Sequence, residues 1–204
     1  MGDGVIKGAF VPLICGSAVK AIGIDSLLDI LINFSPSPLF RKEQADNKSL
    51  SAFVFQTISE THLGEVSLFR VYSGTLSSGS NVYNSVKKKE EKVGQVYLMR
   101  GISREETPQV VAGDIGAIVK LKNTDTGDTF SDKGNPVVFP PLDFPLPSTS
   151  IALTPKGQKD EQKMSTALAR LMKVDPLLKV EVDKESRQTI ISGAGEVHLE
   201  IMIE

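Results

Sequence analysis

Hydrophobic and polar positions follow three successive patterns along the 204-residue chain. In the first, the apolar run at residues 10–14 is typical of a buried strand, and it ends at Cys15. Apolar residues then recur at positions 24, 27, 28 and 31, which lie on one face of a helix. Asp25 is the expected N-cap of this helix. The Ser-Pro-Ser-Pro sequence that begins at Ser35 should end it, because proline lacks a backbone N–H and disfavours helical geometry at the preceding residue.

The second pattern runs from residue 50 to about 139 and consists of short β-rich segments. It predicts strands at residues 52–58, 65–72, 81–86, 92–98 and 115–121. Turn residues separate these segments at Gly74, Gly79, Gly113 and Gly127-Asp128. Several short strands at this spacing favour a β-sandwich or β-barrel over βαβ units. A polar linker at residues 41–49 precedes this region, and five prolines between 136 and 147 follow it as a stiff, extended connector.

The third pattern predicts the order β-α-β-β-α after the prolines. Strands are expected at residues 150–154, 178–182 and 188–192, and a helix at 160–174 that buries Met164, Leu168 and Leu171. Residues 196–203 alternate as a strand would. We favour a helix there, because Gly193-Ala194-Gly195 permits a sharp reversal and Glu196 suits the positive end of a helix dipole. This order is a split βαβ, ferredoxin-like unit that lacks its final strand.

Composition narrows the class of protein. Hydrophobic residues make up 40% and charged residues 24%, as in an ordinary folded protein. The net charge of −2 excludes a global basic field, so any contact with nucleic acid must come from a local patch. Cys15 is the single cysteine, so no internal disulfide can form, which fits a reducing cytosol. No apolar run is long enough to span a bilayer. We therefore expect a cytoplasmic protein without membrane contact.

Residue types that usually perform catalysis are scarce. His62, His198 and Cys15 do not have the spacing of zinc ligands. The sequence at 193–196 lacks the Lys-Ser/Thr pair of a phosphate-binding loop, so we interpret it as a strand-to-helix turn. Adjacent carboxylates at 90–91 and 105–106 are expected in solvated, polar segments. We expect no catalytic residue and no metal site in this chain.

One loop nevertheless resembles part of a nucleotide site. Gly16-Ser17-Ala18 and Lys20 follow an apolar segment and precede a predicted helix. This setting is similar to the last of the five signature loops of guanine-nucleotide-binding proteins, in which backbone amides meet the guanine base. The resemblance implies that Ser17 and Ala18 would contact guanine. The loops that grip phosphate and magnesium are absent from the sequence, so we expect this chain alone to bind no cofactor.

A basic cluster forms the second candidate site. Its members are Lys87, Lys88, Lys89, Lys92, Arg100 and Arg104. One interpretation is a solvated hairpin turn of mixed charge. The other is contact with RNA phosphates, which lysines neutralise without reading the base sequence. No aromatic cluster lies among these basic residues, so contact with folded RNA by shape and charge fits better than base stacking.

Two longer signatures resemble the elongation factor G family, the GTPases that drive ribosomal translocation. They are RVYSGTLSSGSNVY at 70–83 and QTIISGAGEVHLEIMI at 188–203. The resemblance implies the end of a GTPase domain at 1–38, a linker at 39–49, a translation-factor β-barrel at 50–147 and a partial ferredoxin-like domain at 148–204. The chain departs from the usual family pattern at Ala194, where methionine is usual, and at Val197, where leucine is usual.

By this resemblance the chain is an internal piece of a larger translational GTPase, and GTP and magnesium would belong to the full-length parent. The expected partners are small-subunit ribosomal RNA and protein, together with the GTPase and distal domains of the same parent; the piece itself is expected to be monomeric. The parent looks like an enzyme, whereas this segment should be inactive. Two alternatives stay open: a ribosomal protection or recycling factor, and a free-standing RNA-binding adaptor, against which the loop at Ser17 argues.

Overall fold

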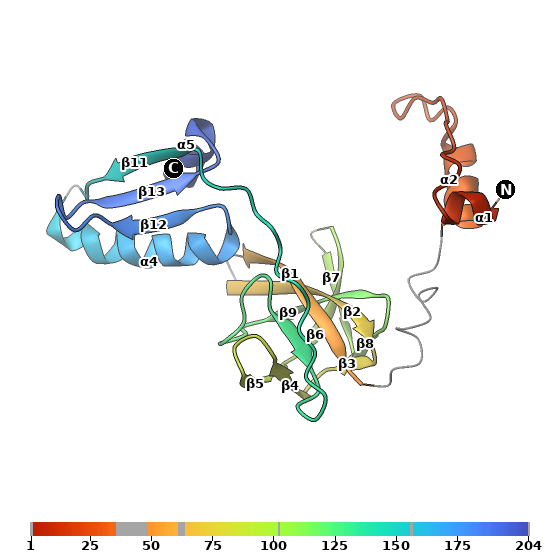
Figure 1. Ribbon diagram of the computed structural model, residues 1–204, viewed down its shortest axis with the longest axis horizontal. Helices are drawn as coiled ribbons and strands as arrows, with labels where there is room; N and C mark the ends of the chain where they lie inside the picture. Colours follow the sequence, from red (N-terminus) through yellow and green to blue (C-terminus); the bar gives the residue numbers. More distant parts are fainter. Residues whose placement is uncertain (1, 36–48, 61–63, 102, 156, 204) are drawn as a thin grey trace. The chain divides into compact units, whose positions relative to one another are not determined.

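The computed structural model of the protein describes residues 2–35, 49–60, 64–101, 103–155 and 157–203. Figure 1 shows the path of the chain. The chain divides into two compact units, residues 1–45 and 46–204. Among the described residues, the first unit holds helices α1 (Gly2–Ile6) and α2 (Ile24–Phe34), and the second holds the strands and two further helices. No described helix is long and apolar enough to cross a membrane.

Helix α2 confirms the predicted helix but not its predicted cap. Its N-cap is Gly23, with φ 74, and no side chain caps the helix. Asp25 instead lies in the first turn, where its charge complements the positive end of the helix dipole. No residue of α2 is buried, and Leu27, Leu28 and Leu31 are 40%, 49% and 49% exposed. The apolar face thus exists as predicted but is open in the described unit.

The buried strand predicted at residues 10–14 is wrong. This segment has no regular structure, and the Phe10, Val11 and Leu13 side chains are 63%, 88% and 93% exposed. The described residues of this unit contain no strand to pair with it, and an extended segment without a partner has no ladder of hydrogen bonds. The Pro36 and Pro38 stop signals and nearly all of the predicted linker lie outside the described residues.

The second unit begins with an antiparallel β-barrel. Its strands are β1 (Ser51–Glu60), β2 (Gly64–Ser73), β3 (Thr75–Ser77), β4 (Asn81–Asn84), β5 (Lys89–Lys92), β6 (Val96–Arg100), β7 (Ser103–Thr107), β8 (Gln109–Val111), β9 (Ile115–Val119) and β10 (Thr129–Ser131). Eight of them form one sheet in the order β5-β4-β10-β1-β2-β9-β6-β7, and β3 pairs with β8. Apolar side chains alternate inward to form the core, which includes Val54, Phe69, Val71, Ile118 and Phe130.

The barrel corrects one predicted strand. Residues 92–98 were expected to be continuous, but the chain breaks between β5 and β6. At the break, the Val93 amide donates to the Ser80 carbonyl at 2.9 Å, and the Gly79 amide donates to the Gly94 carbonyl at 3.0 Å. The break therefore exists because this segment bonds back to the turn before β4. The predicted turn glycines are confirmed, since positions 74, 79, 113 and 127 all have positive φ.

The proline-rich connector is attached to the barrel by an aromatic side chain. The Phe139 ring lies 4.7 Å from the Tyr72 ring and 5.9 Å from the Phe53 ring, measured between centroids. The Phe139 amide also donates to the Thr129 hydroxyl at 3.1 Å. Beyond this point, residues 140–146 are exposed. The first part of the connector is thus fixed to the barrel surface.

The rest of the second unit confirms the β-α-β-β-α prediction. Its elements are β11 (Thr149–Leu153), α4 (Gln158–Val174), β12 (Lys179–Val182), β13 (Thr189–Gly193) and α5 (Glu196–Ile203). The antiparallel sheet has the order β11-β13-β12, as a split βαβ unit requires. A separate small core contains Leu168, Leu178, Ile191 and Leu199. The ambiguous segment at 196–203 is a helix, as we favoured.

Candidate nucleic-acid interface

The four lysines of the basic cluster lie on the β4–β5 hairpin, whose tight turn is shaped by Asn84. The Asn84 side-chain oxygen accepts from the amides of Val86 at 3.2 Å and Lys87 at 3.0 Å. Its side-chain nitrogen donates to the Asn123 carbonyl at 3.0 Å and to the Asp128 carboxylate at 2.9 Å. A single buried side chain therefore closes the turn and ties it to the loop at 121–128.

Glu91 is the main anchor of this hairpin. Its side chain is buried, and its two carboxylate oxygens accept from the backbone amides of Lys122 and Asn123, each at 2.8 Å. The expectation that Glu90 and Glu91 are both solvated is wrong for Glu91, because side chains alternate between the two faces of a strand. Glu90 is exposed and pairs with Lys133 at 2.7 Å. The hydrogen bond and charge of Lys133 lower the Glu90 pKa, and Glu90 raises the Lys133 pKa in return.

Lys87 points into this anchored region and away from free solvent. Its ammonium group pairs with Asp125 and lies 3.3 Å from the buried Asp128 carboxylate. Burial lowers the Lys87 pKa, but the hydrogen bond to Asp125 and the charges of both aspartates outweigh it, so the pKa is raised. The positive charge of Lys87 is therefore compensated within the protein.

The other lysines form the free part of the cluster. Lys88, Lys89 and Lys92 are exposed, and Lys89 makes one long contact of 3.4 Å with the Asn123 side chain. Neither Lys88 nor Lys92 has a side-chain hydrogen bond or ion pair with any described residue. Lys122 is also exposed, and the hydrogen bond from its backbone amide to the Glu91 carboxylate places it beside β5. Sequence reasoning missed Lys122, because the pairing that brings it there spans 31 positions.

The two predicted arginines lie elsewhere, on the β6–β7 hairpin. Arg100 pairs with Glu105 at 3.2 Å, and Arg104 pairs with Glu60 at 2.7 Å. Strands β5 and β7 are at opposite ends of the eight-strand order, and Figure 1 shows the two hairpins at different sides of the barrel. The structure therefore divides the six predicted residues into a lysine group and an arginine group.

The loop that resembles a guanine site lies in the first unit. Ser17 and Ile22 exchange backbone hydrogen bonds of 3.0 and 3.1 Å, and the Ser17 hydroxyl accepts from the Lys20 amide at 3.3 Å. A side chain at Gly16 would meet the Ile22 carbonyl at 2.6 Å, so this closed turn requires glycine there. The described structure thus gives Ser17 and Ala18 a small, closed loop; their contact with guanine stays a prediction.

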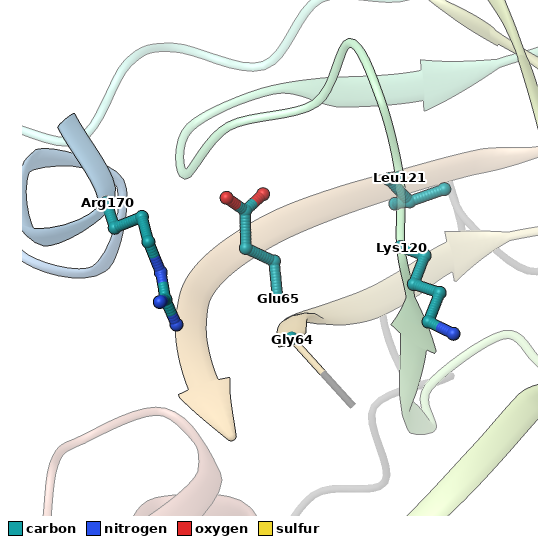
Figure 2. Close-up of a pocket in the computed structure, with 5 residues that line it drawn as sticks. All are labelled: Gly64, Glu65, Lys120, Leu121 and Arg170. Carbon is teal, nitrogen blue, oxygen red and sulfur yellow. The ribbon is translucent and has the colours of Figure 1, made fainter. Parts of the chain in front are cut away.

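A pocket lies between the barrel and α4. It has a volume of about 520 Å³ and is lined by Gly64, Glu65, Lys120, Leu121 and Arg170. Figure 2 shows Arg170 and Glu65 on facing sides, with the Lys120 ammonium group pointing away from both. No group of three metal-ligating side chains occurs in the described part of the chain. The pocket therefore presents one carboxylate and one guanidinium group and no converging set of donors.

His198 has a structural place at the start of α5. Its Nδ1 accepts from the Ala194 amide at 3.0 Å, so the proton of the neutral ring is on Nε2. Nε2 then donates to Asp175 at 2.6 Å. Asp175 also accepts from the Leu177 amide at 2.8 Å and caps the end of α4. These bonds join the end of α4 to the start of α5.

Comparison with known proteins decides the family. The model of elongation factor G domain 2 matches residues 49–133, and the model of elongation factor G domain III matches residues 144–204. The chain belongs to the elongation factor G family. A crystal structure of a protein from Thermus thermophilus is similar, with a TM-score of 0.84 and 27% sequence identity. The match covers 98% of this chain and 30% of the Thermus chain, so the present chain spans 30% of that protein's length.

The family match assigns the candidate features to domains. The lysine and arginine groups and Lys122 all fall within elongation factor G domain 2, and α4 and His198 fall within domain III. The recognition made from the two sequence signatures is thereby confirmed, as is the fold class of a β-barrel followed by a ferredoxin-like unit. This elongation factor G family member is a translation-factor relative, and its lysine hairpin is a feature of the barrel domain.

Proposed function

We propose that this elongation factor G family member promotes ribosomal translocation and that its barrel binds small-subunit ribosomal RNA through the β4–β5 hairpin. One observation carries the proposal: three exposed lysines lie on a hairpin held by buried carboxylates. Lys88, Lys89 and Lys92 are free to neutralise phosphates, while Glu91 and Asp128 fix the backbone that presents them. A fixed presentation lowers the conformational entropy lost on binding.

The other predicted contacts have a smaller part in this proposal. Lys87, Arg100 and Arg104 already face carboxylates of the protein, so binding a phosphate would require them to exchange partners. Lys122 carries an exposed charge beside the hairpin and joins the contact set. We therefore place most of the electrostatic attraction on Lys88, Lys89, Lys92 and Lys122.

The segment performs no chemical step in this proposal. GTP and magnesium are bound by the full-length parent, in which Ser17 and Ala18 contact the guanine base. The barrel holds the ribosome, and the domain III part relays the nucleotide state to the rest of the protein. The exposed charges of Lys88, Lys89 and Lys92 support the binding role of the barrel.

The test is the salt dependence of ribosome binding by the full-length factor. Replacing Lys88, Lys89 and Lys92 by alanine should flatten the plot of log affinity against log salt by about 2–3 units, since each phosphate contact contributes about 0.7–0.9. A matched control replaces three exposed lysines of the domain III part, Lys163, Lys179 and Lys184. Equal slopes for the hairpin variant and the wild type would favour the solvated-turn interpretation.

A further inference from the structure

The barrel and the domain III part have separate hydrophobic cores. The barrel core draws its residues from positions 50–130, whereas the second core draws them from 151–202, and no residue belongs to both. Two basic residues of α4 make side-chain hydrogen bonds to the barrel. Arg170 donates to the Ser59 hydroxyl at 3.0 Å, and Lys173 donates to both carboxylate oxygens of Glu65 at 3.0 Å.

The two contacts match in spacing. Arg170 and Lys173 are three residues apart on α4, which places them on one face of the helix, about 5–6 Å apart. Ser59 and Glu65 are direct cross-strand partners in the β1–β2 hairpin, a relation that separates side chains by about 4.5–5.5 Å. A helical pair therefore meets a strand pair of the same width. This geometry fixes α4 at two points on the end of the hairpin.

We propose that these four residues form an electrostatic latch that holds α4 on the barrel and can release it without unfolding either core. The Lys173 and Glu65 side chains are 42% and 26% exposed, so water and salt reach the ion pair. The pocket of about 520 Å³ that Glu65 and Arg170 line gives solvent a second route to the contact. Screening or exchange of these charges therefore separates α4 from the barrel while the two cores, which have no residue in common, stay intact.

The latch is tested by the distance between the two parts in the whole chain. Cys15 is replaced by serine, and spin labels are placed at Thr75→Cys on the barrel and Glu185→Cys on the domain III part, both exposed positions. In about 0.01 M salt the wild type should give one narrow distance distribution. In about 1 M salt, where the screening length falls from about 30 Å to about 3 Å, that peak should be lost.

Charge reversal provides the second measurement. Lys173→Glu should lose the narrow peak even in low salt, and the double exchange Glu65→Lys with Lys173→Glu should restore it. Lys184→Glu, which makes the same charge change at an exposed turn, should leave the peak unchanged. A peak that survives both high salt and Lys173→Glu would overturn the proposal, as would a folded double exchange that does not restore it. If Lys173→Glu fails to fold, the salt series on the wild type decides alone.

Discussion

The carboxylate of Glu91 lies 2.8 Å from the backbone nitrogen of Lys122, although Glu91 belongs to the most basic segment of the chain. Its second oxygen binds the next amide, that of Asn123, at the same distance. A buried carboxylate that accepts two amides is well compensated, and each amide in turn has its partner. The hairpin and the loop are thus joined by one acidic side chain.

Glu91→Ala should lower the free energy of unfolding of the barrel by about 1–3 kcal/mol, because it leaves two backbone amides without their acceptor. Urea denaturation followed by circular dichroism gives this value. Glu91→Gln retains one acceptor oxygen, so its free energy of unfolding should lie between those of the wild type and Glu91→Ala.

Glu90→Ala is the matched control for Glu91→Ala, since Glu90 is the neighbouring residue with an exposed ion pair. It should leave stability nearly unchanged, because exposed pairs contribute little. Equal losses for Glu90→Ala and Glu91→Ala would contradict the anchoring role of Glu91.

Lys87 should make the free energy of unfolding of the barrel fall as the pH rises in the alkaline range. Its pKa in the folded protein is raised above the ordinary value of 10.5, so its stabilisation is complete below that value and is lost as the pH rises through the raised pKa. Lys87→Met should therefore be less stable than the wild type at neutral pH, and the difference should shrink above pH 10.5. Denaturation of both proteins across this range measures it. A difference that stays constant with pH would argue against the pairing with Asp125 and Asp128.

Gly116→Ala should destabilise the barrel core. A methyl group at this position would lie 2.6 Å from Phe69 and 2.7 Å from Val110, and both of those side chains are buried. Overpacking of this kind costs about 1–3 kcal/mol, which should appear as a lower melting temperature. Gly134→Ala, which has no neighbour within 4 Å, is the control. If both variants melt with the wild type, the close contact with Phe69 is not rigid.

His198→Ala should loosen the start of α5. It removes the acceptor of the exposed Ala194 amide and the donor to the partly buried Asp175, at a cost of about 0.5–1.5 kcal/mol. Amide hydrogen exchange at Ala194 should accelerate. Val197→Ala, the adjacent residue with 68% exposure, should leave that exchange rate unchanged. Identical exchange in all three proteins would show that the histidine bonds do not hold the turn.

The 204-residue chain should not bind GTP by itself. The sequence has a single loop that resembles a guanine contact, at Ser17 and Ala18, and no phosphate-binding loop. Backbone amides at one loop cannot compensate the charge of a triphosphate, which proteins bind with a glycine-rich loop, a lysine and magnesium. Isothermal titration calorimetry should detect no heat of binding. Micromolar affinity would contradict the assignment of nucleotide binding to the parent.

The elements that sequence predicted well are those whose signal is local. The helix at α2 follows from the spacing of its leucines, and α4 follows from the period that buries Leu168. The helix α5 was favoured because of the glycines that precede it, although its apolar residues alternate. These helices depend on residues three or four positions apart, so a short stretch of sequence is enough to predict them.

The features that sequence missed depend on distant partners. The break between β5 and β6 is set by bonds to Gly79 and Ser80, and the burial of Glu91 is set by a loop 31 positions later. The contact of Arg170 with Ser59 spans 111 positions. A charged residue is normally exposed, so no local pattern predicts a buried carboxylate or the partner that makes its burial favourable.

The attachment of Phe139 to Tyr72 sets the length of the tether between the barrel and the domain III part. The free connector begins only after Phe139 and reaches β11 at Thr149. At about 3.1 Å per residue for a proline-rich chain, the roughly nine residues between them reach no further than about 30 Å. So short a connector keeps the released α4 at a millimolar effective concentration near Ser59 and Glu65. Replacing Phe139 would free more of the connector from the barrel. The longer free connector would lower the effective concentration of α4, although all four latch residues would still be in place.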